Sequence, residues 1–159
     1  MNQTDPVKMT IAASYTLYNT INQILYEDDK KTERNINFGI KYKLLRSKDL
    51  LEKDVLFFEN ERNQLIRELG TSDESSGTIK VTDENMPKFQ ESLQKLLKIE
   101  VEHTLFKLKP EDMENIVGVN LDAQSMGLFM AAMIDDPLLE EDIKKPINKE
   151  NSEVSESNN

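Results

Sequence analysis

The sequence predicts an α+β fold that is mainly helical, with one long helix packed against shorter helices and a small antiparallel strand pair. Three observations predict it. Residues 36–69 contain no proline and carry apolar side chains at steps of seven. Residues 9–26 and 122–134 repeat apolar side chains every three or four positions, as amphipathic helices do. Residues 78–82 and 98–108 have the β-branched or alternating pattern of strands.

The first predicted helix runs from about Met9 to Tyr26. Its apolar residues recur at helical spacing and should lie on one face: Ile11, Tyr15, Tyr18, Ile21 and Leu25. The charged segment at positions 27–31 that follows should be a linker or a frayed helix end.

The long helix is expected from Ile36 to Leu69 and would measure roughly 50 Å. Gly70 fits the terminating position, where a positive φ is wanted. Two heptad series form a stripe along this helix, one apolar and one half charged, which indicates self-association. The stripe residues proposed for that contact are Leu44, Leu51, Val55, Phe58, Arg62, Leu65 and Leu69. Leu45, Leu56, Phe57 and Ile66 widen the stripe, which favours more than one packing neighbour. Arg62 either fixes the register of the seam or covers apolar surface with its stem, and the second interpretation is preferred.

Residues 78–108 are expected to form a strand–helix–strand insert at one end of the long helix. The insert helix can be capped by Asp83 or Asn85, with Pro87 in its first turn. The second strand has an obvious partner in Ile79–Val81, because a lone strand is not stable in water.

After Pro110, residues 111–116 are expected to form a helical turn, and Asp122 can cap a last helix. Four side chains on that helix fill the core by default, but they also suit an adaptable partner groove: Met126, Phe129, Met130 and Met133. Residues 1–143 are predicted to form a single helical domain. The remaining residues, 144–159, have the composition of a disordered acidic tail.

The composition argues against familiar catalytic chemistry, and the sequence predicts no enzyme and no cofactor. No cysteine is present, and His103 is the only histidine, which disfavours thiolate or histidine-based metal sites. The five glycines form neither a P-loop nor a dinucleotide fingerprint. The spacing of Glu100 and His103 matches the Glu-x-x-His of di-iron bundles, but it falls in a strand-like segment, so we predict no metal ligands.

Charge is unevenly distributed along the chain. The net charge is −10, and yet residues 30–48 contain seven basic side chains and a single acid. Lys41, Lys43, Arg46 and Lys48 lie in this basic band, where they can contact nucleic acid or an acidic partner, although solvation is the favoured interpretation. With no secretory signal or membrane-spanning stretch in the sequence, a cytoplasmic protein without membrane contact is expected.

The order of the segments carries a resemblance. The long helix ends in Phe58-Glu59, Glu61-Arg62, Leu65-Ile66 and Glu68-Leu69-Gly70, and a polar loop, a helix with Phe89-Gln90-Glu91-Ser92-Leu93 and an Ile-Glu-Val-Glu strand follow. This arrangement resembles small uncharacterised proteins of tailed bacteriophages from low-GC hosts. A prefoldin-like helical hairpin is the second resemblance, although its return helix would be much longer.

The resemblance and the composition together favour a non-enzymatic, phage-encoded accessory or assembly protein. It would self-associate and contact a phage or host protein. Two alternatives stay open: a nucleic-acid-associated factor that uses the basic band at 30–48, and an inhibitor of a host enzyme with an acidic surface.

Overall fold

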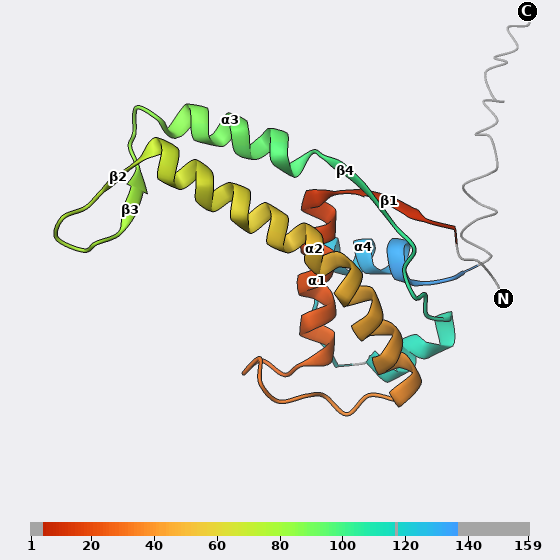
Figure 1. Cartoon of the computed structure of the whole chain (residues 1–159). Coiled ribbons are helices and arrows are strands. Elements are labelled where there is room, and N and C mark those ends of the chain that lie inside the picture. Colours follow the sequence, from red (N-terminus) through yellow and green to blue (C-terminus); the bar gives the residue numbers. More distant parts are fainter. Residues whose placement is uncertain (1–4, 117, 137–159) are drawn as a thin grey trace, which may run out of the picture.

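The computed structural model describes residues 5–116 and 118–136 (Figure 1). It confirms an α+β fold dominated by helices. The elements in chain order are β1 (Val7–Thr10), α1 (Ile11–Leu25), α2 (Phe38–Leu69), β2 (Gly70–Ser72), β3 (Ile79–Val81), α3 (Met86–Leu97), β4 (Glu100–His103), the 3-10 helix η1 (Pro110–Ile116) and α4 (Ala123–Met133).

Helix α2 is the long central helix, and its two halves lie in two different parts of the molecule (Figure 1). Its first half packs with α1, α4 and the β1–β4 ribbon, which together we call the body. Its second half stands out from the body with the β2–β3 hairpin at the tip and α3 returning alongside. We call this projection, residues 56–97, the arm. The arm is two helices thick, whereas the body closes around a core.

The core of the body forms where α1 and α4 meet the first half of α2. Apolar side chains spaced three or four apart on each helix point to the same interior, because that spacing returns to one helical face. The fully buried members of this core are Leu17, Ile21, Ile24, Leu44, Leu51, Leu105, Leu108, Phe129 and Met133. This packing confirms that the stripe on α2 meets more than one neighbour, since α1 and α4 both lie in the same core cluster.

Side-chain caps place the helix starts close to their expected positions. Thr10 accepts a hydrogen bond from the amide of Ala13 at the start of α1. Asp122 does the same for Ser125 at the start of α4, as the sequence predicts. Asn85 precedes α3 but donates instead to the carbonyl oxygen of Leu69, at 3.0 Å. That bond satisfies one of the carbonyl groups left open at the end of α2.

The expected pairing between the two strands of the insert is wrong. β3 pairs with β2 in a local antiparallel hairpin, and β4 pairs with β1, with Val7 opposite His103 and Thr10 opposite Glu100. Helix α3 explains the difference. Its 12 residues carry the chain about 18 Å away from the hairpin, back to the base of the arm, where the free edge of β1 lies.

Gly70 does not adopt the positive φ expected of a helix-terminating glycine. Its φ is −98° and its ψ is 166°, so the chain turns directly from α2 into the extended strand β2. The absence of a side chain is required for a different reason. A Cβ at this position would lie 2.4 Å from the carbonyl oxygen of Ile66 and 2.6 Å from Cγ2 of Ile79.

Replacement of Gly70 by alanine should therefore destabilise the arm. Because the nearest obstructing atom is backbone, the clash must be relieved by a shift of the hairpin, and we expect a loss of about 1–3 kcal/mol in the free energy of unfolding. Gly127 is the matched control, since a Cβ there meets nothing within 4 Å. Gly127→Ala lies inside α4 and should stabilise the protein by about 0.5–1 kcal/mol. Urea unfolding of both variants measures the contrast, and equal effects would refute the steric explanation.

The cap of α4 should make stability depend on pH in the acidic range. Hydrogen bonds from the backbone and side chain of Ser125 lower the pKa of Asp122 below its usual value. A carboxyl group with a depressed folded-state pKa contributes stability above its unfolded pKa of about 4, and that contribution is lost as the pH falls through the folded value. Asp122→Asn can still cap without ionising, so its melting temperature should lose this part of the pH dependence. Thermal melts between neutral pH and about pH 3 test it, and parallel curves for wild type and variant would contradict it.

Candidate functional site

Three polar side chains from three elements meet inside the body. The Oδ2 atom of Asp54 on α2 accepts hydrogen bonds from Ser14 Oγ on α1, at 2.7 Å, and from His103 Nε2 on β4, at 2.6 Å. Ser14 is fully buried, and the side chains of Asp54 and His103 are mostly buried. Sequence patterns did not predict this cluster. A signal was available, because Ser14 interrupts the apolar face of α1 and a buried hydroxyl needs a partner.

The order of these hydrogen bonds differs from that of a nucleophilic triad. In a Ser-His-Asp triad the histidine lies between the other two groups and takes the proton of the serine. Here the carboxylate of Asp54 lies in the centre and accepts from both neighbours through one oxygen. The arrangement ties α1, α2 and β4 together, which is the role that its burial also favours.

The Glu-x-x-His spacing lies on a strand, as the sequence predicts. Glu100 and His103 are the first and last residues of β4, and Glu100 is exposed while His103 turns toward Asp54. Among the described residues, no three acidic or histidine side chains gather in a way that could hold a metal ion.

The basic band is divided between two sides of α2. Lys41 forms an ion pair with Glu33, and the Nζ atom of Lys48 lies 5.6 Å and 5.5 Å from the ring centres of Tyr18 and Tyr26. Both of these cations therefore already have intramolecular partners. The structure does not bring the four predicted contact residues together on one surface.

The other two cations of the band lie beside exposed aromatic rings. The guanidinium of Arg46 is 5.7 Å from the ring centre of Phe106, and Tyr42 packs edge-on against the same ring at 6.3 Å. Phe38 is 89% exposed one turn before Tyr42. Lys43 is half-buried on this part of α2 and has no ion pair with another described residue. We call Phe38, Tyr42, Arg46 and Phe106 the aromatic–cation surface.

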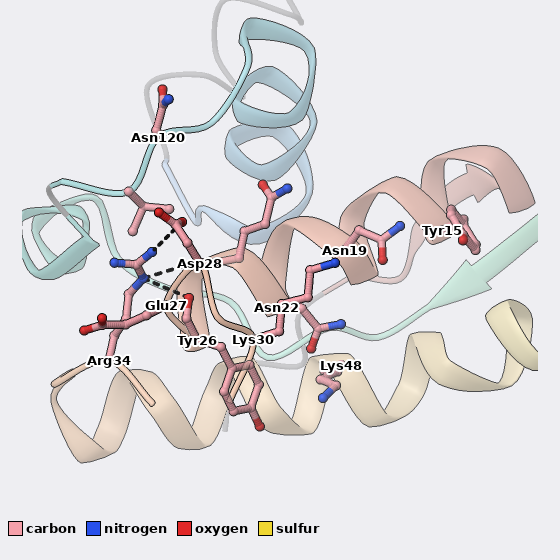
Figure 2. A pocket seen from close by; sticks show the side chains of 12 residues that line it. Tyr15, Asn19, Asn22, Tyr26, Glu27, Asp28, Lys30, Arg34, Lys48 and Asn120 are labelled. Atoms are coloured by element: carbon pink, nitrogen blue, oxygen red, sulfur yellow. Dashed lines mark hydrogen bonds and ion pairs between the residues drawn. The ribbon is translucent and has the colours of Figure 1, made fainter. Parts of the chain in front are cut away.

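A polar pocket of about 910 Å³ opens between α1, the loop after it and the segment that precedes α4 (Figure 2). Amide side chains of Asn19 and Asn22 line it, and two of its cations, Arg34 and Lys48, have intramolecular partners. Arg34 donates through Nε to the carbonyl oxygens of Gln23 and Tyr26, and its guanidinium lies 3.8 Å from Asp28. Figure 2 shows these contacts holding the arginine across the loop. These contacts of Arg34 tie the loop between α1 and α2 to the end of α1.

The proposed partner groove on the last helix is mostly core. Phe129 and Met133 are fully buried against α1 and α2, so they offer no surface to a partner. Met126 and Met130 are half-buried. Core filling, the default interpretation of this methionine spacing, accounts for the two buried members.

The stripe proposed for self-association is largely covered by the chain itself. Five of its residues are buried: Leu44, Leu51, Val55, Phe58 and Leu69. They form no free seam: Leu44 and Leu51 lie in the core of the body, and Phe58 packs with Ile11 of α1 and Leu96 of α3. Only Arg62 and Leu65, both on the arm, are half-exposed. Arg62 lies with its guanidinium 5.8 Å from the ring centre of Phe58, and its Nε is buried with no hydrogen-bond partner among the described residues.

No helix within residues 5–116 and 118–136 has both the length and the hydropathy that spanning a membrane requires. Comparison of the chain with protein-family models, with curated proteins and with solved structures finds no match.

Proposed function

We propose that this chain is a non-enzymatic accessory or assembly protein, encoded by a bacteriophage, that acts by contact and self-associates through its arm. The phage origin rests on the resemblance of the long helix and its polar loop. The mode of action rests on the shape of the molecule. The proposed self-association contact is therefore not the whole stripe on α2 but the part of it, in the arm, that the body does not cover.

The observation that carries the proposal is the thin core of the arm. Every apolar side chain between positions 56 and 97 remains at least 7% exposed, whereas many in the body are completely buried. The half-buried residues include Leu65 and Ile66 on α2 and Leu93 and Leu97 on α3. At the base of the arm Leu93 and Leu97 pack in one cluster with Ile11 of α1. Farther out, the two helices cover each other's apolar faces from one side only. A second pair of helices laid against them would complete a four-helix bundle.

The charges of the two arm helices favour a second copy of the chain as the partner that packs against the arm. The part of α2 in the arm carries three glutamates against two arginines, while α3 carries two lysines against one glutamate. Two arms packed with α3 of one beside α2 of the other would therefore bring opposite net charges together. Such complementarity steers association and fixes its register more than it adds affinity.

Sedimentation of the full chain over a range of concentrations tests this proposal. We expect a monomer at low micromolar concentration and a dimer at high micromolar concentration. The double variant Lys88→Glu/Lys95→Glu should weaken the dimer, because it places like charges across the contact. Adding Glu61→Lys and Glu68→Lys to that variant should restore it.

The control separates association from folding. Circular dichroism at a concentration where every variant is monomeric should show similar helix content, since Lys88, Lys95 and Glu68 are exposed and Glu61 is half-exposed. A wild-type protein that stays monomeric at high micromolar concentration would overturn self-association. So would a dimer that neither charge change affects, because the contact would then lie outside the arm.

A further inference from the structure

We propose that the aromatic–cation surface of the body binds single-stranded nucleic acid by stacking bases on Phe38 and Tyr42. This activity is separate from the contact made by the arm. Phe38 and Leu56, where the arm begins, are about 27 Å apart along α2.

The surface presents aromatic rings that do not serve the core. Phe38 is 89% exposed, Tyr42 59% and Phe106 37%, although aromatic side chains of this size normally contribute to folding by burial. Phe38, Tyr42 and Arg46 are spaced by four along α2, so they share one face over about 12 Å. Phe106 comes from the segment after β4, where its backbone N–H donates to Ser47 Oγ at 2.9 Å. That bond fixes the ring beside Tyr42 and Arg46.

Arg46 supplies a cation at these rings, and further basic residues lie close by along α2 and in the sequence after Phe106. Arg46 lies against Phe106, and Lys43 precedes it by one turn of the helix. Lys107 and Lys109 follow Phe106 in the sequence. The acidic side chains nearest along α2 are Asp49 and Glu52, which follow Arg46 and bound the surface on that side. Exposed rings bordered by cations are what a phosphate chain with accessible bases requires.

The chemistry favours a single strand over a duplex. In a duplex the faces of the bases are stacked inside and only their edges are accessible, whereas an unpaired base offers its π face to a ring. The acidic remainder of the protein also disfavours the broad basic footprint of duplex binding. The short row of rings on α2 fits two or three bases, as on other stacking platforms.

Fluorescence anisotropy with labelled oligothymidine and oligouridine of about 16 nucleotides tests the proposal at about 50 mM salt. We expect saturable binding of both strands that weakens as salt rises. Phe38→Ala and Tyr42→Ala should each weaken binding about tenfold, because each removes one stacking ring. Arg46→Glu should weaken binding and flatten the salt dependence. Lys80→Glu, with the same change in net charge on the β2–β3 hairpin, and Phe57→Ala, an exposed ring outside the surface, should bind like wild type.

The proposal is overturned by any of four results. The first is that the wild-type protein binds neither strand, and the second is that both alanine variants bind as tightly as wild type. The third is that a duplex of the same length binds as tightly as the single strands. In the fourth result, vesicles with anionic phospholipid retain the protein while the oligonucleotides do not. Melting curves of the variants should match wild type, since the substituted side chains are exposed.

Discussion

Replacement of Leu51 by alanine should lower the free energy of unfolding by about 2–5 kcal/mol. Leu51 is completely buried, in the core that α1, α4 and the first half of α2 form together. Its truncation removes apolar contacts and leaves a cavity that helices anchored on several sides cannot readily close. Urea unfolding followed by circular dichroism measures the loss.

Leu56 provides the matched control on the same helix. It belongs to the set of apolar residues that widen the stripe, but it is 53% exposed. Leu56→Ala should therefore change the stability of the monomer by less than about 0.5 kcal/mol. If the two substitutions had similar effects, Leu51 would not be covered by its own chain and the stripe would have to be packed between molecules instead.

Replacement of Asp54 by alanine should cost about 3 kcal/mol of stability. The change leaves the hydroxyl of Ser14 and the imidazole of His103 without the acceptor that both use. It also removes the side-chain hydrogen bond that links β4 to α2. Asp54→Asn keeps an oxygen in place but loses the charge, so its effect should be smaller than that of alanine.

Asp49 is the control for this second comparison, because it is an exposed carboxylate earlier on the same helix. Asp49→Ala should leave the unfolding transition within about 0.5 kcal/mol of wild type. A stability of Asp54→Ala equal to that of Asp49→Ala would show that the cluster does not hold the three elements together.

Local patterns predicted the helices well. The long apolar series without proline locates α2 to within two residues, and Asp122 locates the start of α4, because periodicity and capping are properties of neighbouring residues. The fold class follows from the same patterns. The predicted Met9 start of the first helix failed because Val7 to Thr10 alternate as a strand does, and that short alternation precedes a strong helical pattern.

Long-range partners were beyond these patterns. The pairing of β4 with β1 joins residues at least 90 positions apart, and no local signal distinguishes β1 from the nearer β3 as a partner. The hydrogen bond between Asp54 and His103 was unpredictable for the same reason, since no local pattern near either residue identifies the other as its partner. Phe106 joins the aromatic–cation surface only through the path of the chain after β4. Heptad spacing on α2 likewise cannot tell whether another segment of the chain or a second molecule covers the stripe.

Hydrogen exchange at two protein concentrations tests most directly whether the arm is the contact surface. On raising the concentration from low to high micromolar, backbone amides in residues 56–97 should exchange more slowly, because a second arm shields them and opposes local opening. Amides in α1 and α4 should keep the same rates. Exchange in the arm that is independent of concentration, or slowing confined to the body, would contradict the account.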